Sequence, residues 1–295
     1  MRLNASCIRS VLLICFVLLL FVSLPSQAQT LRLGTITNTP VDEIRTYHHL
    51  ANYLQTQLAS QGIKRVEVKM ASSIEQMITY LQQQEIDLYI DSSMVALLVN
   101  QKADSQFLLR RWKKGRASYH SVIAVVNGGV VRNLSDLHGQ NIAFEEPFST
   151  SGFILPYLSL SVQGIQHAKG QANANALGYQ FAYDNESQIT WLERGKVQAA
   201  AMSGKDFQEL TATALKPLWV LHQTPEVPYH VVVHRSGLDP QLINTVKTIL
   251  MQAEQSEAGR LMLQQFERTT RFDEIPLPLL NNMQPLAQHF SSLPL

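Results

Sequence analysis

Three hydroxyl side chains and a glycine follow one another in the segment Ser149-Thr150-Ser151-Gly152. A strand-like segment, Asn141 to Phe144, and the proline turn at Pro147 precede them, so a helix is expected to begin at these residues. A helix start offers unpaired backbone N–H groups and the positive end of the helix dipole, and hydroxyls can rotate to donate to an anion. Glycine lets a ligand approach the backbone closely. The segment therefore predicts an oxyanion site that needs no lysine or arginine.

A plain helix N-cap is the structural alternative for this segment. For an isolated Ser-Thr-Ser-Gly run it is the better interpretation, because Ser and Thr are favoured caps. One cap uses one hydroxyl, however, and this segment supplies three. The two additional hydroxyls favour a ligand-binding role for this segment.

The elements before this loop alternate between strand and helix. The predicted strands are 31–36, 66–70 and 86–90, and the predicted helices are 41–60, which Gly62 ends, and 73–84. Alternation of this kind is typical of a mainly parallel sheet covered by helices. Asp91 follows the third strand, where open α/β sheets present ligand loops. It is a candidate ligand contact, and capping of a helix that starts near Ser93 is an equally good interpretation.

Two apolar runs, Ser121 to Val126 and Tyr229 to His234, are interpreted as crossover strands between two lobes. A second set lies between them, with a strand at 141–144, helices near 149–152 and 189–194, and a strand at 197–202. After the second run, helices at 240–254 and 258–267 precede a proline-punctuated tail. The expected lobes are residues 30–122 with 232–295, and residues 127–228, with the ligand cleft between them.

The N-terminal 28 residues have the pattern of a secretory signal peptide. Arg2 and Arg9 precede an apolar run of about 14 residues, and cleavage is expected after Ala28. The run is shorter than the roughly 20 residues of a membrane span, and Cys15 lacks the small residues before it that lipid attachment needs. Both cysteines, Cys7 and Cys15, fall in this segment, so the exported chain has no disulfide.

The remaining chain has 22 basic and 23 acidic residues, a formal net charge of −1, since the signal removes two of the 24 basic residues. No nucleic-acid signature is present. His230 and His234 would lie about 13 Å apart in a strand, too far for one metal ion, and the adjacent His48 and His49 point to different sides of a helix. The sequence also lacks G-x-S-x-G and S-x-x-K motifs, so neither a metal site nor an enzyme is expected.

Several segments together resemble the phosphate/phosphite/phosphonate-binding components of bacterial ABC importers. The family's Ser-Thr-Ser-Gly anion loop matches Ser149 to Gly152, and its Tyr-x-Ser matches Tyr119-His120-Ser121. Leu134 to Gly139 resembles its Leu-x-Asp-Leu-x-Gly turn, and Gly195 to Ala199 resembles its Gly-x-Val-Asp-Ala segment, with Gln198 in place of the acid. The resemblance covers nearly the whole mature chain.

This resemblance implies an α/β, type II periplasmic-binding-protein fold, with two lobes joined by two hinge strands. It also implies that Ser149, Thr150 and Ser151 donate to ligand oxygens beside Gly152, and that Tyr119 contacts the ligand at the cleft edge. Tyr47, in the first helix, is a candidate aromatic wall of the cleft. For either tyrosine alone, a partly buried structural role is the better interpretation.

Two departures from the family pattern bear on the ligand. Tyr183-Asp184-Asn185-Glu186 replaces the usual Gly-Ser-His-Asp, so Asn185 stands in for a histidine donor. Asp91-Ser92-Ser93 replaces Gly-Pro, which makes Ser92 a further candidate contact beside Asp91. We expect a periplasmic, monomeric binding protein without a cofactor, whose partners are a small oxyanion and an ABC permease. A sensor of the same fold that signals to a membrane receptor is the alternative, and an enzyme acting on a phosphorylated small molecule is a weaker one.

Overall fold

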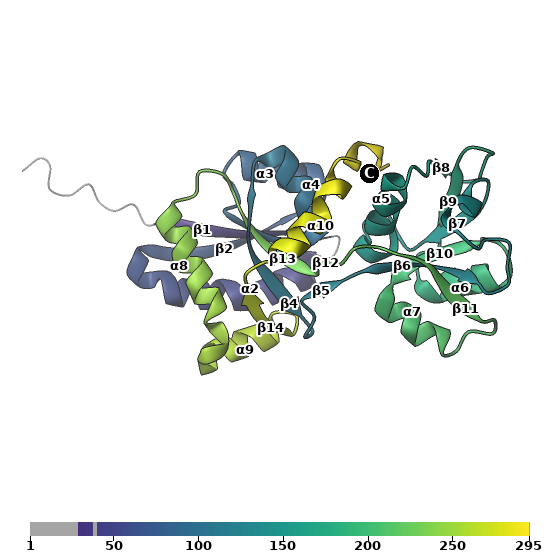
Figure 1. Ribbon diagram of the computed structural model, residues 1–295. Helices are drawn as coiled ribbons and strands as arrows, with labels where there is room; N and C mark the ends of the chain where they lie inside the picture. Colours follow the sequence, from purple (N-terminus) through teal and green to yellow (C-terminus); the bar gives the residue numbers. More distant parts are fainter. Residues whose placement is uncertain (1–28, 38–39, 295) are drawn as a thin grey trace, which may run out of the picture.

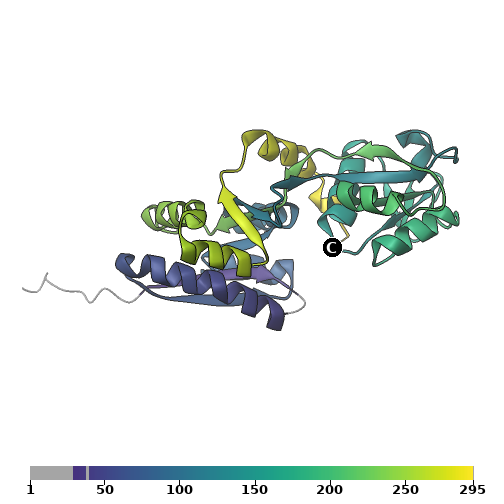
Figure 2. The same ribbon diagram turned by 90° about the horizontal axis from the view of Figure 1, so that it is seen from below.

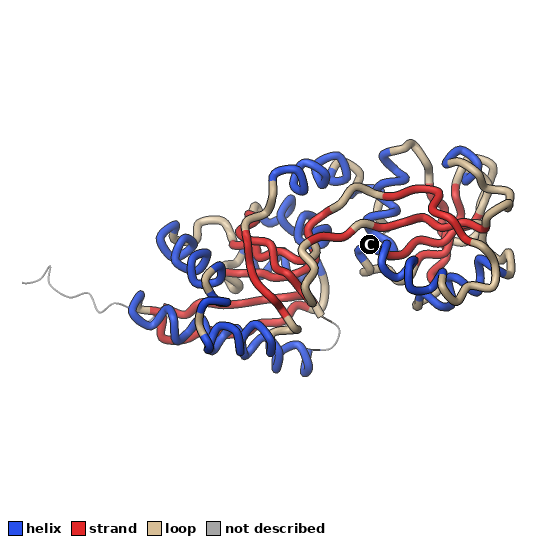
Figure 3. Tube along the Cα trace, turned by 60° about the horizontal axis from the view of Figure 1, so that its bottom comes forward, coloured by secondary structure: helices blue, strands red, loops and turns tan. Residues whose placement is uncertain are grey.

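The computed structural model describes residues 29–37 and 40–294 and contains two six-stranded sheets joined by a two-stranded ribbon. Each sheet carries helices on both faces and forms one lobe (Figures 1 and 3). The expected signal peptide lies outside the described residues. Across the described part, no helix combines the length and apolar character needed to cross a bilayer.

The first sheet has the strand order β14-β4-β13-β3-β1-β2. Its strands are β1 (Gln29–Ile36), β2 (Ile63–Ala71), β3 (Leu88–Ser92), β4 (Gln106–Lys113), β13 (His230–His234) and β14 (Thr269–Asp273). Its helices are α2 (Pro40–Leu58), α3 (Ile74–Gln82), α4 (Ser93–Ala103), α8 (Pro240–Met251) and α9 (Glu257–Gln265). β1 pairs in parallel with both β2 and β3, as the strand and helix alternation predicts.

Alternate residues of the central strands pack against different helices. Leu88 and Ile90 of β3 share a buried cluster with α2, α8 and α9, whereas Tyr89 between them packs with α3 and α4. A strand buried on both faces needs apolar residues at every position, because successive side chains point to opposite sides. This requirement explains the unbroken apolar run at the start of β3.

The second sheet has the order β11-β6-β10-β7-β9-β8. Its strands are β6 (Ser121–Val126), β7 (Asn141–Phe144), β8 (His167–Lys169), β9 (Leu177–Phe181), β10 (Ala199–Ser203) and β11 (Leu218–Gln223). Its main helices are α5 (Leu155–Val162), on one face, and α6 (Asn185–Glu193) and α7 (Gly204–Thr211), on the other. β7 pairs in parallel with β9 and β10, so these strands end at one edge.

The chain crosses between the lobes through the short antiparallel ribbon of β5 (Ser118–Tyr119) and β12 (Val227–Pro228). The two apolar runs interpreted as crossover strands follow these ribbon strands: β6 belongs wholly to the second sheet and β13 wholly to the first. The predicted two-strand connection between the lobes is confirmed, but the crossing lies just before each run, in β5 and β12, and the runs themselves are interior strands of one sheet each. The lobe limits expected above stay a prediction.

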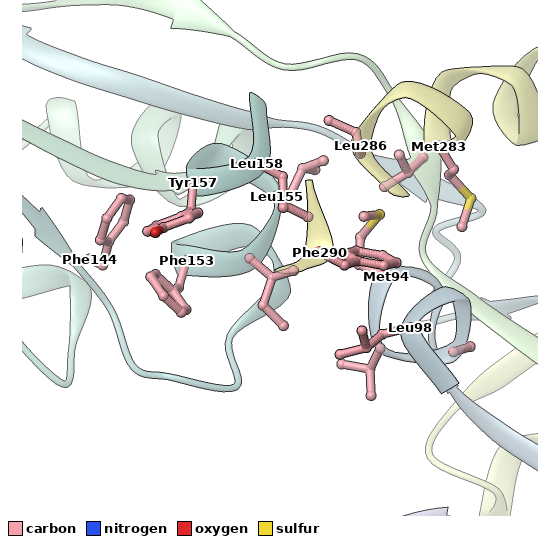
Figure 4. Packing of buried hydrophobic residues seen from close by; sticks show 14 of the residues in the cluster. Met94, Leu98, Phe144, Phe153, Leu155, Tyr157, Leu158, Met283, Leu286 and Phe290 are labelled. Carbon is pink, nitrogen blue, oxygen red and sulfur yellow. The ribbon is translucent and has the colours of Figure 1, made fainter. Parts of the chain in front are cut away.

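The proline-punctuated tail forms an ordered bridge between the lobes. After β14 it folds into α10 (Leu277–Ala287) and a 3₁₀ turn, η5 (Phe290–Ser292). Met283, Leu286 and Phe290 pack with Met94 of α4 and with α5, so one buried cluster runs through both lobes (Figure 4). Tyr157 donates to the Ser292 carbonyl at 2.7 Å. Figure 2 shows this segment against the second lobe.

His167, on β8, supplies a test of the second lobe's core. Its ring stacks on Tyr157 at 3.8 Å, and burial lowers its pKa to about 4. The unfolded chain therefore binds more protons than the folded one as pH falls from about 6.5 to 4, which costs up to about 3 kcal/mol of stability in that window. We expect His167→Phe to remove this loss in urea titrations from pH 7 to 4. The exposed His48→Phe is the control, and equal acid sensitivity in wild type and His167→Phe would contradict the expectation.

Candidate functional site

The loop after β7 turns into a helix at the hydroxyl cluster. Ser149 is the N-cap: its Oγ accepts the N–H of Gly152 at 2.9 Å, and its carbonyl accepts from Phe153 and Ile154. The first turn, Thr150–Ile154, is a π-helix that continues into α5. The predicted helix start is therefore confirmed.

A hydrogen bond at this loop joins the two lobes. Thr150 Oγ1 donates to Ser92 Oγ, at the start of α4 in the other lobe, over 2.9 Å. The Tyr119 phenol, on the hinge ribbon, lies close to Thr150, and burial raises the pKa of this phenol, so it keeps its proton. Three predicted residues from two lobes and the hinge thus meet at one point. Ser151 is partly exposed beside them.

Asp91 lies in β3 and lines a cavity of about 170 Å³ between the lobes. The other lining residues come from the ends of β1 and β2, from α3 and α4, and from the hydroxyl loop: Ile36, Thr37, Ser72, Ser73, Ile74, Val95 and Phe148. Asp91 accepts hydrogen bonds from the Ser92 N–H at 2.7 Å and the Tyr89 hydroxyl at 2.9 Å. Burial raises the pKa of its carboxyl despite these bonds.

The capping interpretation of Asp91 is wrong. Ser92 occupies the N-cap position of α4, and its side chain makes no capping hydrogen bond. Asp91 pairs with Val231 in the sheet and is one residue too early to cap. Its possible role in ligand recognition stays a prediction.

Tyr47 does not lie in the cleft. Only 2% of it is exposed, its hydroxyl donates to the Ile90 carbonyl at 3.0 Å, and its ring meets Phe266 edge-on at 4.9 Å. The prediction of an aromatic wall is wrong because α2 turns this residue toward the sheet. Tyr47 instead supports the strand that carries Asp91.

Asn185 begins α6, at the same sheet edge as the hydroxyl loop. The two segments are adjacent, since the N–H of Tyr183 donates to the Glu145 carbonyl at 2.7 Å. Within the described residues, the buried Oδ1 of Asn185 has no hydrogen-bond partner. Asn185 makes no described hydrogen bond to the hydroxyl loop. Only its position therefore supports the prediction that it replaces a histidine donor.

Two features of the site were missed at the sequence level. Ser149 donates its hydroxyl proton to Glu145 Oε2 at 2.6 Å, so a carboxylate lies inside the loop. Beside Tyr119, a second cavity of about 230 Å³ is lined by Arg116, Lys205 and the start of α7. Spacing alone gave no signal for either feature. The hydrogen bond requires the folded turn between β7 and α5, and the cavity depends on how the chain returns through the hinge. The described residues contain no cluster of three or more metal-ligating side chains.

Two α/β lobes whose helix starts and parallel strand ends meet across a two-stranded hinge define a type II periplasmic binding protein. Residues 33–276 match the family described as "ABC transporter, phosphonate, periplasmic substrate-binding protein". The chain belongs to this family of periplasmic substrate-binding proteins, whose members are solute-binding components of transporters.

Solved structures share the fold at low identity. XAC2383 from Xanthomonas citri, bound to chloride, is 24% identical with a TM-score of 0.76, and the match covers 90% of this chain and 98% of that one. The same protein was also solved with ATP. PhnD1 from Prochlorococcus marinus, in complex with methylphosphonate, is 16% identical with a TM-score of 0.58, covering 90% of this chain and 100% of that one. A phosphonate-transporter binding protein from Pseudomonas aeruginosa is 15% identical, with a TM-score of 0.56 and coverage of 89% and 88%.

Proposed function

We propose that this protein captures a small phosphorus oxyanion, such as phosphate, phosphite or a phosphonate, and delivers it to an ABC permease by lobe closure. The contact between Thr150, Ser92 and Tyr119 carries the proposal. It brings hydroxyl donors from both lobes and the hinge to a helix start, where an oxyanion is favoured electrostatically. A ligand that bonds to both sides stabilises the closed state over the open one.

Membership in the phosphonate-type family supports this ligand class. The methylphosphonate complex of PhnD1 is consistent with it, although that protein is only 16% identical. Chloride and ATP, found with XAC2383, are alternative ligands that need direct comparison. Genes for a permease and an ATPase beside this one would favour transport, and a lone receptor or cyclase gene would favour sensing.

A thermal-unfolding panel tests the proposal. The mature protein is mixed with phosphate, phosphite, methylphosphonate, 2-aminoethylphosphonate, sulfate, chloride or ATP. A ligand at 100 times its Kd adds about 2.7 kcal/mol of stability, which raises Tm by roughly 5–10 °C in a protein of this size. We expect such a rise with at least one of the four small phosphorus oxyanions, namely phosphate, phosphite, methylphosphonate and 2-aminoethylphosphonate. A rise with chloride or ATP and with none of those four would overturn the proposal.

A further inference from the structure

The cavity of about 230 Å³ beside Tyr119 lies between the hinge ribbon and the start of α7. Tyr119 forms part of its wall and also lies close to Thr150 of the hydroxyl loop. The start of α7 is near the same loop, because the Asp206 carboxylate in its first turn helps to raise the pKa of Glu145. The cavity therefore adjoins the oxyanion loop, with Tyr119 as the wall between them.

The wall that α7 contributes is fixed to the hinge. The N–H of Gly204, the first residue of α7, donates to the His120 carbonyl at 3.1 Å. A Cβ built at Gly204 would lie 2.3 Å from Nε2 of His120, so the imidazole packs directly on the glycine. Ser203 caps the helix by accepting the N–H of Asp206 at 3.0 Å. This side of the cavity is therefore held in place by backbone and ring contacts.

Two charged residues at this cavity have no counter-charge. Arg116 lines it from the segment between β4 and β5, and Glu226 lines it from the segment between β11 and β12. In the part of the chain that the structure describes, no ion pair involves either side chain. The other cation of the cavity, Lys205, is paired with Glu209. One free cation and one free carboxylate at a single cavity suit a ligand group that carries both charges.

The positive charge of Arg116 acts on the hinge ribbon. Burial raises the pKa of the Tyr229 phenol, and Arg116 partly opposes that rise. The Tyr229 ring meets the Tyr119 ring edge-on at 5.0 Å. The charge of Arg116 is therefore near the two ribbon tyrosines, one of which adjoins the hydroxyl loop.

We propose that this cavity binds the organic arm of the ligand, and that the arm is an α-amino acid group. The inference rests on the proposed function and names its substrate class: small phosphorus oxyanions that carry an amino-carboxylate, such as phosphono amino acids. The hydroxyl loop binds the phosphorus group, Arg116 donates to the carboxylate, and Glu226 accepts from the ammonium. A guanidinium suits this role because two of its N–H groups can bond to both oxygens of one carboxylate.

Titration calorimetry at pH 7 with four phosphonates that differ in their arms tests this on the wild type. 2-Amino-3-phosphonopropionate carries both groups, 3-phosphonopropionate only the carboxylate, 2-aminoethylphosphonate only the ammonium, and ethylphosphonate neither. We expect the carboxylate to raise affinity about tenfold. The ammonium meets the exposed Glu226, so we expect about threefold from it. The ligand with both groups should bind most tightly.

Two variants that each remove one charge assign the two groups. Arg116→Gln should abolish the preference for 3-phosphonopropionate over ethylphosphonate, and Glu226→Gln should abolish that for 2-aminoethylphosphonate over ethylphosphonate. Lys114→Gln and Glu254→Gln remove the same charges at exposed positions that line none of the described cavities, and they should keep the wild-type ranking. Each readout is a ratio of affinities in one protein, so a partly unfolded variant leaves it unchanged.

The outcomes separate this inference from the proposed function. If the wild type binds no phosphorus oxyanion, the proposed function itself fails. If it binds phosphate or phosphite but none of the four phosphonates, or binds the four equally, the function stands and the amino acid arm is overturned. Wild-type preferences in both Arg116→Gln and Glu226→Gln would overturn the assignment of this cavity as well.

Discussion

Thr150→Val and Ser151→Ala are each expected to weaken binding of the cognate oxyanion about ten- to a hundred-fold. A hydrogen bond to a charged group contributes roughly 1.5–3 kcal/mol, and each change removes one donor without changing the backbone. Thr150 should show the larger loss, because its hydroxyl lies where both lobes and the hinge meet. Titration calorimetry with the ligand identified by thermal unfolding measures both values.

Matched controls for these two variants are available nearby. Ser161→Ala removes a hydroxyl of α5 that only donates back to the Tyr157 carbonyl. Thr79→Val removes a hydroxyl on the exposed face of α3 that donates to the backbone carbonyl of Glu75. Both controls should bind like the wild type. If Thr150→Val and Ser151→Ala both bound the ligand with wild-type affinity, the loop would not be part of the binding site.

Glu267→Gln is expected to destabilise the first lobe by roughly 3–5 kcal/mol. Arg111 is completely buried, and its guanidinium pairs with Glu267 at 2.7 Å, while Lys113 pairs with the same carboxylate. Neutralising Glu267 leaves the Arg111 and Lys113 cations without their counter-charge. Among the described ion pairs, neither cation has another carboxylate partner. Urea unfolding at pH 7 gives the change in free energy.

An exposed ion pair is the control for Glu267. Lys205 and Glu209 are about half exposed, so Glu209→Gln should cost under about 1 kcal/mol. Burial by itself raises the pKa of Glu267, but Arg111 and Lys113 outweigh it and hold that pKa below its ordinary value. The stabilising pair is therefore present at neutral pH and is lost as pH falls through this lowered pKa. A cost in Glu267→Gln no larger than that in Glu209→Gln would show that the buried pair is dispensable.

Features that depend on neighbours in the chain could be predicted from the sequence. The helix start at Ser149 is one, because a proline turn, a capping hydroxyl and a glycine all act within one turn. The strand β7 and the left-handed Gly62 after α2 are others. Periodicity also gave the α/β class, since strands buried on both faces need continuous apolar runs.

Features that depend on distant pairing could not be predicted in this way. Arg111 and Glu267 are far apart in the sequence, and nothing local marks either as buried. Tyr47 lies in the first half of α2, and only the rotation of the helix turns it into the core. Glu145 lies only four residues before Ser149, but its hydrogen bond with Ser149 requires the folded turn.

The bridge formed by α10 and η5 limits how the lobes can move. The ribbon of β5 and β12 fastens them at one place, and the apolar contact of Phe290 and Met283 with both lobes fastens them at another (Figure 4). A body held at two separate points can turn only about the line that joins them. We therefore expect the lobes to rotate about a single axis, through the ribbon and the Phe290 contact. A bound ligand would then change only the angle between the lobes.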